Sequence, residues 1–583
     1  MGTPARVDLD SEQSQVAHAE PEARSMVIAG PGAGKTEVVI ERIAHLVYEE
    51  DVDPTEILVI SFSNAAIDTV RRRLLEMDEH LDDVDITTLD SLALRILSYA
   101  GEDEEVKGFD RRIRGAADIL AEGPVHELRN IRHVIVDEVQ DIVGDRAWLT
   151  LALISRFDDS VGFTVLGDEL QGIYDFQLPE SVRRMTSIEL MQQLSALGAG
   201  PPIELRGRYR FKSRETSAIA DLGQRLRSLT GSAQLHELDA VGTQLAHMRD
   251  VEELAEVVSV WRGSTAVLCS TNGEALEIYD TLAQAGIPVV LRPRKSEAVI
   301  DSWVGEALAE WPRATISRDE FAGLAQFAPL PEGAWRALRW SAGSRGADLR
   351  VRDVAQGILR HRVMPPVAAS PLTGVVVTTI HRAKGLEFDN VVVVLPSEYR
   401  RGLLGVTDRV RRGFVALSRA KSQIAVLDRD IQFDRIQKDE RSGRWLRRGH
   451  KKWQTFGFEL RGSDTRSAAP PVLSEASMVT LRSVRPRDPV ELVLDPSRST
   501  LTEPYYWVLR DGVEIGQTGV ELAEDFRRCF GDISKKGYWP AGLSARVERL
   551  ETLAGKAGDG APQGLWLSPR IQSLAKIRWK DTK

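Results

Sequence analysis

The chain has 583 residues, of which 42% are hydrophobic and 28% charged, and its formal net charge is −10. A single core rarely grows beyond about 250–300 residues, so we expect several domains. No apolar run reaches the roughly 18 residues of a membrane span, and the first residues lack the apolar segment of a secretory signal. The two cysteines, Cys269 and Cys529, exclude a disulfide framework and a cysteine-based zinc site. We therefore expect a cytoplasmic protein, in which any nucleic-acid binding comes from a local groove and not from overall charge.

The stretch AGPGAGKT, Ala29 to Thr36, has the spacing of a phosphate-binding loop. It follows the apolar run 26–29 and precedes a segment, 37–47, with apolar residues at helical spacing, so it joins a strand to a helix. Such a loop points backbone N–H groups at a phosphate, and its lysine and hydroxyl suit the phosphates and Mg²⁺. The alternative is an ordinary glycine-rich turn. The predicted nucleotide-binding residues of the loop are Ala29, Gly30, Pro31, Gly32, Ala33, Gly34, Lys35 and Thr36.

Apolar runs at 57–60, 131–136 and 163–166, with a shorter one at 85–88, alternate with segments of helical pattern. This alternation predicts a doubly wound parallel α/β sheet with ligands at the carboxyl ends of the strands. Asp137 and Glu138 follow one predicted strand directly, which is the Walker B arrangement: Asp137 would hold the metal, and Glu138 would activate the attacking water. The alternative is a surface acidic pair. Gln13, upstream of the loop, is a candidate adenine contact because an amide both donates and accepts, although any exposed glutamine gives the same signal.

Further motifs follow in order along the chain, and together they point to one protein family. They are SFSNAA (61–66), DEVQD (137–141), GDELQGIYDF (167–176), Arg208-Tyr-Arg210, TIHRAKGLEF (379–388) and VALSRA (415–420). Together with Gln13 and the loop, this series resembles the motifs of superfamily 1 helicases of the UvrD/Rep/PcrA type, across residues 9 to about 425. The resemblance implies two RecA-like parallel-sheet motor domains, ATP and Mg²⁺ as cofactors, and single-stranded DNA, with or without partial duplex, as the partner.

The resemblance also implies roles for individual residues. Gln171 would sense the γ-phosphate, and Arg210 and Arg419 would act as arginine fingers, because a guanidinium is planar, permanently charged and multidentate. Tyr209 would stack on adenine, and Glu387 would contact the ribose. Taken alone, each arginine would more often form a surface ion pair, and the ordered set of motifs reverses that preference.

Single-stranded DNA would run across both sheets and stack on aromatic rings, which tolerates any base sequence. An aromatic residue taken alone is more often part of the core, and stacking does not distinguish DNA from RNA. The residues that the resemblance assigns to DNA are Phe62, Asn64, Tyr174, Phe176 and His381.

The sequence departs from the family at several places. Glu37 stands where the family has an arginine that stacks on adenine, and Asp90 replaces a histidine that usually faces DNA, where a carboxylate would repel phosphate. We expect domain 1A at 1–200 with a short 1B insertion near 92–130, domain 2A at 201–294 and 371–432, and a reduced helical 2B-like insertion at 295–370. We further expect a linker at 433–471 and a small α+β accessory module at 472–583. This C-terminal module could bind a protein partner.

The segment 435–452 is strongly basic, so it could grip phosphates or be a solvated linker. Beyond Pro471, a hairpin is expected at 505–515, turning at Arg510-Asp-Gly512, and a helix near 520–529. The whole pattern predicts an ATP-dependent, 3′→5′ single-stranded-DNA translocase or helicase in repair, recombination or defence. The alternative is a DNA-stimulated regulatory ATPase subunit of a repair or anti-phage complex with little processive unwinding.

Overall fold

The computed structural model describes residues 8–62, 64–101, 108–123, 125–174, 178, 184–292, 299–324, 331–344, 346–395, 405–428, 435–449, 454–466, 472–534, 539–558 and 561–579. The chain divides into two compact units. The first unit comprises residues 1–247, 380–393 and 398–426, and the second comprises residues 248–379, 394–397 and 427–583.

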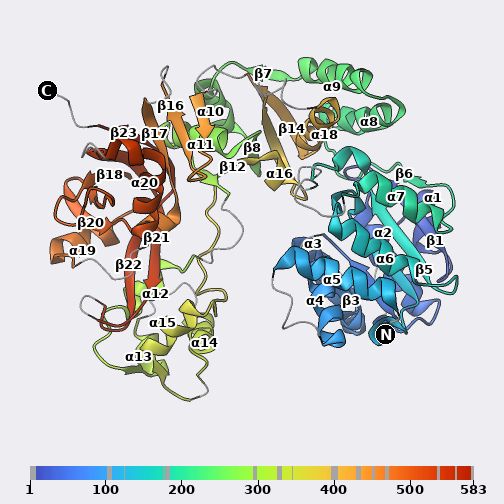
Figure 1. The fold of residues 1–583 in the computed structure, drawn as a ribbon, viewed down its shortest axis with the longest axis horizontal. Helices are drawn as coiled ribbons and strands as arrows, with labels where there is room; N and C mark the ends of the chain where they lie inside the picture. Colours follow the sequence, from blue (N-terminus) through green and yellow to red (C-terminus); the bar gives the residue numbers. More distant parts are fainter. Residues whose placement is uncertain are drawn as a thin grey trace. The chain divides into compact units, whose positions relative to one another are not determined.

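The first unit is built on a parallel sheet of six strands in the order β3-β2-β4-β5-β1-β6. Figure 1 labels β1, β3, β5 and β6 of this sheet. The strands are β1 (Arg24–Ala29), β2 (Ile57–Ile60), β3 (Asp85–Thr87), β4 (His133–Val136), β5 (Gly162–Gly167) and β6 (Ile203–Leu205). β2, β4 and β5 are buried along their whole length, which explains why they read as continuous apolar runs. Because parallel strands end at one edge, the segments that follow β1, β4 and β5 meet there.

Hydrophobic clusters cover both faces of this sheet, as a doubly wound fold requires. One face packs against α2 (Lys35–Tyr48) and α3 (Asn64–Met77), and the other against α4 (Leu89–Ala100), α5 (Phe109–Glu122), α6 (Asp145–Ser155) and α7 (Ser187–Ala196). The expected 1B insertion therefore forms α4 and α5, which share the core of the sheet. The remaining helices of this unit are α1 (Ser11–Ala17), α8 (Arg214–Ser228), α9 (Ser232–Gln244), α16 (Ile380–Ala383) and α18 (Val406–Leu417).

A second sheet has the strand order β7-β14-β13-β8-β12-β9. Its strands are β7 (Ala246–Met248), β8 (Thr265–Cys269), β9 (Val289–Leu291), β12 (Val375–Thr379), β13 (Phe388–Val394) and β14 (Ala420–Leu427). β12 pairs in parallel with both β8 and β9, and α10 (Val251–Val260) and α11 (Asn272–Gln284) belong to the same unit as these three strands. The predicted pair of parallel-sheet α/β domains is confirmed. The boundary expected at residue 200 lies later, because β6 pairs with β1.

The expected 2B-like insertion is helical. Its elements are α12 (Ser302–Leu308), β10 (Thr315–Ile316), α13 (Arg318–Ala322), α14 (Pro331–Ala342), β11 (Leu349–Arg350) and α15 (Val351–Leu359). Its core contains Trp303 and Trp335 and also Leu565, which comes from the C-terminal region. The insertion therefore shares a hydrophobic core with a segment more than 200 residues away in the sequence.

The C-terminal region forms a nine-stranded sheet with the path β15-β16-β17-β23-β21-β18-β19-β20, and β22 pairs with β21. The strands are β15 (Ile436–Lys438), β16 (Trp445–Arg448), β17 (Thr455–Leu460), β18 (Pro489–Leu494), β19 (Tyr506–Arg510), β20 (Val513–Gln517), β21 (Gly542–Ala554), β22 (Leu565–Ile571) and β23 (Ser573–Arg578). The predicted hairpin is β19–β20, with Asp511 and Gly512 at positive φ in the turn, and the predicted helix is α20 (Val520–Ser534). A further helix, α19 (Glu475–Arg482), contacts β20.

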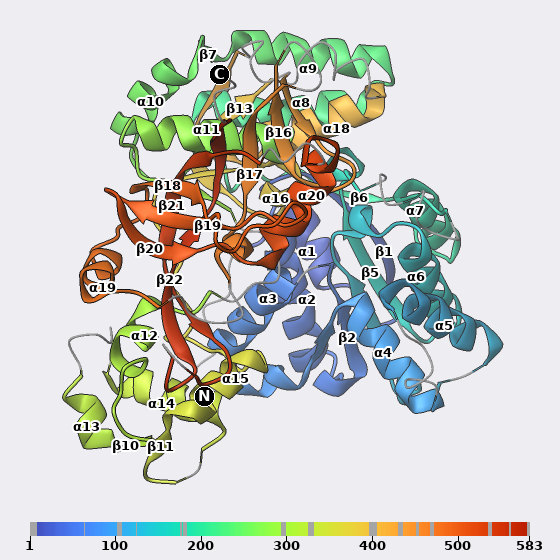
Figure 2. The ribbon, with the colours of Figure 1, turned by 60° about the vertical axis from the view of Figure 1, so that its left-hand side comes forward.

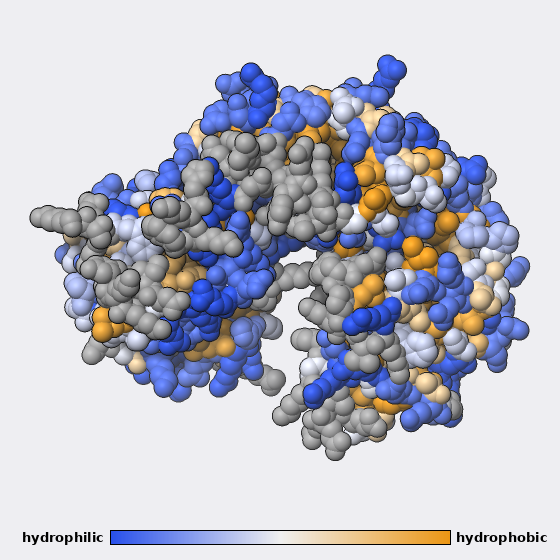
Figure 3. Space-filling view, turned by 45° about the horizontal axis from the view of Figure 1, so that its top comes forward, coloured by the Kyte–Doolittle hydropathy of each residue, from blue (hydrophilic) through white to orange (hydrophobic). Residues whose placement is uncertain are grey.

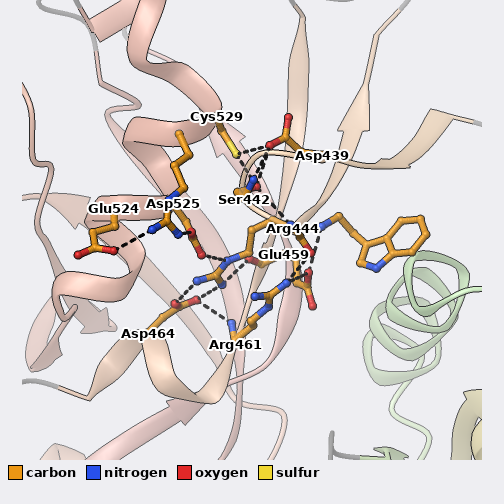
Figure 4. A network of polar contacts seen from close by, with 12 residues as sticks. Asp439, Ser442, Arg444, Glu459, Arg461, Asp464, Glu524, Asp525 and Cys529 are labelled. Atoms are coloured by element: carbon orange, nitrogen blue, oxygen red, sulfur yellow. Dashed lines mark hydrogen bonds and ion pairs between the residues drawn. The ribbon is translucent and has the colours of Figure 1, made fainter. Parts of the chain in front are cut away.

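The structure differs from the expected linker at 433–471, because residues 436–460 provide three strands of this sheet. Figure 4 shows the cause: the guanidinium of Arg444 is buried between two carboxylates, 2.7 Å from Asp464 and 2.6 Å from Asp525. The paired charge lets a basic segment enter a core. Arg447 pairs with Glu277 and Arg448 with Asp439, so these arginines of the basic run are engaged within the unit.

Figures 1 and 2 show β21 and β22 side by side with α12, and the insertion helices gather at that end of the hairpin. On the face drawn in Figure 3, hydrophilic residues predominate and hydrophobic ones are scattered among them, as is usual for a water-exposed surface. Within the described part of the chain, no helix combines the length and apolar character needed to cross a bilayer.

Candidate nucleotide and nucleic-acid site

The phosphate-binding loop connects β1 to α2, and its glycines are required by their surroundings. Gly32 and Gly34 have φ of 74° and 83°, a region that favours glycine. A side chain at Gly32 would collide with Cβ of Arg210, and one at Gly34 would collide with the amide of Gln13. The loop is therefore closed tightly between two predicted site residues, and Lys35 and Thr36 begin α2 at the positive end of its dipole.

Lys35 and the acidic pair after β4 lie together at the carboxyl edge of the sheet. The Lys35 Nζ is 3.2 Å from Oε1 of Glu138 and 3.4 Å from the carbonyl oxygen of Ala29. Glu138 has φ of 55°, an uncommon conformation for a residue with a side chain, and such strain is often found at functional sites. Its N–H donates to Oδ1 of Asp137, 2.9 Å away.

The two carboxyl groups of this pair are in opposite electrostatic situations. Burial, together with the neighbouring Glu138, raises the pKa of Asp137. Burial also opposes ionisation of Glu138, but Lys35 and Lys384 outweigh it and lower the pKa of Glu138. Glu138 is thus held as a carboxylate, the form that a general base requires. Asp137 would become a metal ligand in its ionised form, which a bound cation would favour.

Gln171 lies in the segment after β5, and its side-chain amide is hydrogen-bonded through both its nitrogen and its oxygen. Its Nε2 donates to Oδ2 of Asp168, 2.9 Å away, and its Oε1 accepts from Nη2 of Arg419, also 2.9 Å away. Arg419 is 3% exposed and donates in addition to the Val415 carbonyl oxygen and the Ser418 hydroxyl. Burial, followed by the charge of Arg210, lowers the pKa of Arg419 to about 10, so it remains a cation at neutral pH.

Arg210 also reaches the loop, where its Cβ lies against Gly32. Its Nη2 pairs with Glu387, and Glu387 lies 3.1 Å from Nζ of Lys421. Among the described residues, the buried Nη1 of Arg210 has no hydrogen-bond partner. A buried guanidinium nitrogen without an acceptor is costly in a finished structure, and an anionic oxygen of a nucleotide would satisfy it. The residues at this edge therefore fit a nucleoside triphosphate.

The predicted adenine contacts lie on the other side of the loop. The amide of Gln13 accepts from the Asp10 N–H and donates to the Ala33 carbonyl oxygen, 3.1 Å away, so it closes a capping box and touches the loop. The Tyr209 hydroxyl donates to Asp10 at 2.7 Å and lies 3.3 Å from Oε1 of Gln13. Tyr209 is 59% exposed, so its ring is accessible for stacking.

Two charged residues of this site were not assigned roles from the sequence. Lys384 is almost completely buried, and its ammonium contacts Asp141 and the carbonyl oxygen of Gln171. The same ammonium is 5.4 Å from the centre of the Tyr174 ring. Burial raises the pKa of Asp141 to about 7 against the opposing charge of Lys384. Both residues belong to motifs that were recognised, DEVQD and TIHRAKGLEF, so the signal was present although no function was attached to it.

Some of the predicted nucleic-acid contacts lie close together in the structure. The rings of Phe62 and Tyr174 lie 5.0 Å apart between centroids and are tilted by 39°. His381 bonds to the backbone of Ile173, and burial, with the charges of Arg412 and Lys384, lowers its pKa to about 4, so it is neutral at neutral pH. A neutral His381 suits a hydrogen bond better than a phosphate ion pair. Phe176 and the side chain of Asn64 lie outside the described residues.

Two departures from the family have partners in the structure. Glu37 lies 2.6 Å from Nη2 of Arg73, so its carboxylate ties α2 to α3. Asp90 forms two contacts with Arg146, at 2.8 and 3.2 Å. The guanidinium of Arg146 offsets the charge of Asp90, so the expected repulsion of a DNA phosphate is weaker than the sequence alone indicates.

Comparison with known proteins finds similarity to helicase domains in two parts of the chain. A family model described as the UvrD/REP helicase N-terminal domain matches residues 9–130, and the UvrD-like helicase C-terminal domain matches residues 374–427. In these two regions, which together make up less than a third of its 583 residues, the chain is similar to UvrD/Rep-type helicases. The two matched regions contain the phosphate-binding loop and the segment from Thr379 to Arg419, and residues 428–583 lie beyond both.

Individual relatives match over short stretches. The ATP-dependent DNA helicase PcrA of Leuconostoc citreum is 40% identical over 79 residues, which are 13% of this chain and 10% of that protein. The ATP-dependent DNA helicase SRS2 of Saccharomyces cerevisiae is 38% identical over 79 residues, 13% of this chain and 7% of that protein. A probable DNA helicase of Mycoplasma pneumoniae is 37% identical over 82 residues, 14% and 16% of the two chains. The chain thus covers about a tenth of the length of these relatives.

Proposed function

We propose that this protein is an ATP-dependent motor that translocates on single-stranded DNA in the 3′→5′ direction and separates strands. The observation that supports it most is the convergence of Lys35, Glu138, Gln171, Arg210 and Arg419 around one loop, with a buried guanidinium nitrogen of Arg210 left without an acceptor. The direction rests on the family resemblance, and the relatives' names supply DNA as the polymer.

Each group at the loop has a chemical task. Lys35 and the loop N–H groups would bind the β- and γ-phosphates, and Gln171 would contact the γ-phosphate. Arg210 and Arg419 would stabilise the charge that develops during phosphoryl transfer. Glu138 would take the proton of the attacking water. Its contact with Lys35 keeps its pKa low, so Glu138 would accept this proton only once Lys35 turns to the phosphates.

Thr36 and Asp137 would hold Mg²⁺, which supplies charge neutralisation at the phosphates. Thr36 is the second residue of α2, and Asp137 follows the last residue of β4, so both stand at the carboxyl edge of the first sheet. Tyr209 would stack on adenine, Gln13 would hydrogen-bond its edge, and Glu387 would contact the ribose.

The strand of DNA would lie over the aromatic pair Phe62 and Tyr174, with His381 close to the same segment. Lys384 joins this pair to the nucleotide site, because its ammonium faces the Tyr174 ring and also contacts Asp141 and Gln171. A change at the γ-phosphate that moves Gln171 would therefore reach the base platform within one side chain. This link supports coupling of hydrolysis to movement on DNA.

A second candidate is a DNA-stimulated regulatory ATPase subunit of a repair or anti-phage complex, in which unwinding is weak. The nine-stranded C-terminal sheet favours it, because residues 428–583 lie beyond the matched helicase domains and share a core with the insertion. A partner protein would bind this module. The two candidates share the ATPase site and differ in strand displacement.

The test compares the wild type with Glu138→Gln and with the control Glu76→Gln, an exposed residue of α3 paired with Arg72. We expect Glu138→Gln to bind ATP and single-stranded DNA normally and to lose turnover by about 10²–10⁴-fold, the usual contribution of a general base. Turnover within about threefold of the wild type would remove Glu138 from that role. Hydrolysis with single-stranded DNA, duplex DNA and RNA, together with displacement of a strand from 3′- and 5′-tailed duplexes, separates the motor from the regulatory ATPase.

A further inference from the structure

A third arginine lies beside the phosphate-binding loop. Arg227 occupies the last turn of α8, and its side chain is 16% exposed. Its Nη2 is 3.0 Å from Oδ1 of Asp168, and its Nη1 is 3.5 Å from Oε1 of Glu204. A Cβ built on Gly30 would stand 3.1 Å from the same Nη2, so the guanidinium also lies against the backbone of the loop. One side chain thus meets the loop, the strand β6 and the segment after β5.

Asp168 connects Arg227 to Gln171. Its side chain is completely buried, and a carboxylate removed from water needs a counter-charge, which Arg227 provides. The other oxygen, Oδ2, accepts from Nε2 of Gln171 at 2.9 Å. Because Asp168 takes the amide nitrogen, the amide oxygen of Gln171 is turned to Arg419. The orientation of the Gln171 amide therefore depends on the place and charge of Asp168.

We propose that Arg227 is a positioning residue for ATP recognition. Through Asp168 it fixes the amide of Gln171, and through its contact at Gly30 it fixes the loop, so that the two parts hold one arrangement around a γ-phosphate. This inference rests on the proposed nucleotide site and adds a residue of α8 to it. A planar guanidinium reaches two carboxylates and the loop at once, whereas a lysine ammonium would serve one of them.

The test uses Arg227→Ala, Arg227→Lys and the control Arg225→Ala. Arg225 lies on the same helix as Arg227, its side chain is 47% exposed, and it pairs with Glu237 of α9. Equilibrium affinities for ATPγS and ADP are measured first. Arg227→Ala is expected to reduce the preference for ATPγS over ADP by about tenfold, because the loss is specific to the γ-phosphate. Arg227→Lys should lose part of this preference, and Arg225→Ala none of it. The kcat of hydrolysis should fall by about 10–100-fold in Arg227→Ala with a smaller change in KM.

Gln171→Ala provides the decisive comparison. Because Arg227 acts partly through Gln171, the double variant should lose less ATPγS preference than the losses of the two single variants added together. Full additivity would overturn the inference. So would an Arg227→Ala variant with a lowered melting midpoint but unchanged preference and kcat, since that result assigns Arg227 to packing alone. A wild type that binds ATPγS selectively but does not hydrolyse ATP would refute the proposed motor and leave the binding test of Arg227 intact.

Discussion

Replacing Arg444 by methionine should destabilise the C-terminal sheet strongly. The side chain is 1% exposed and donates to Asp464 through two nitrogens, each at 2.7 Å, and to Asp525 at 2.6 Å. It also donates to the carbonyl oxygen of Glu459 at 3.2 Å, so it links β16 to β17, to the turn that follows β17 and to α20. Methionine has a similar length and removes every one of these donors.

The size of the effect follows from what the substitution leaves behind. Asp464 loses the guanidinium that contacts both its oxygens, and Asp525 keeps only its pair with Arg528. Removing one partner of a buried pair typically costs about 3–5 kcal/mol. Burial already raises the pKa of Asp464 against the opposing charge of Arg444, and without Arg444 it would rise further. Asp464 would then take up a proton more readily as the pH falls, so the cost should be largest at neutral pH and smaller in acid.

Hydrogen exchange of the amides in β16, β17 and α20 measures this cost locally, since a chain of several domains does not unfold in one step. A loss of about 3–5 kcal/mol corresponds to protection factors lower by roughly a hundredfold to a few thousandfold. The control Arg441→Met, three residues away and exposed, should change stability by less than about 0.5 kcal/mol. The triple variant Arg444→Met, Asp464→Asn, Asp525→Asn should recover part of the loss. An Arg444→Met variant within about 1 kcal/mol of the wild type would refute the reasoning.

Three further outcomes are expected. Arg419→Lys should keep ATP affinity and lower kcat by about 10²–10³-fold, because one ammonium cannot replace donors to Val415, Gln171 and Ser418; mainly weakened binding with normal kcat would contradict a finger role. Burial lowers the pKa of His133 to about 3 from 6.5, so the stability it contributes is present above pH 6.5 and falls, by up to about 3–5 kcal/mol, as pH drops toward 3. The difference in melting midpoint between wild type and His133→Gln should therefore shrink with acid, and a constant difference would contradict this. Deletion of 472–583 should give insoluble or unfolded protein, because it removes Leu565 from the core of the insertion and β23 from β17; a folded ATPase would contradict it.

The parallel-sheet part of the fold was predictable because its signals are local. The loop at Ala29–Thr36 and the pair Asp137–Glu138 each follow an apolar run, and parallel strands bring such segments to one edge without further information. The aromatic pair Phe62 and Tyr174 could be named only through the family motifs. The DNA contact assigned to Phe176 concerns a residue outside the described part of the chain, so it stays a prediction.

Ion pairs between residues far apart in the sequence could not be predicted from such local signals. Arg444 belongs to a basic run that predicts either a phosphate contact or a solvated linker, because arginine is usually exposed. In the structure Asp464 and Asp525, 20 and 81 residues away, neutralise it inside a core. Arg227 gave no signal either, since one arginine on an amphipathic helix is most simply a surface residue, and its partner Asp168 was read only as part of a motif. In both cases the charge became structural through a carboxylate distant in sequence. Pairings of this kind are invisible to composition and periodicity.

The same pairings bear on how the C-terminal region takes part in function. The hydroxyl of Thr552, on β21, accepts from the Gly305 N–H at 2.9 Å and donates to the Asp301 carbonyl oxygen at 2.6 Å, so it joins the sheet to the start of α12. Toward the other part of this unit, Asp280 on α11 accepts from the Leu574 N–H at 2.7 Å. One sheet therefore binds both the insertion and a helix that packs on β12. These contacts involve backbone N–H and C=O groups and not only charged side chains at the surface, so the insertion and α11 should move together. A partner that binds the C-terminal sheet would therefore act on both.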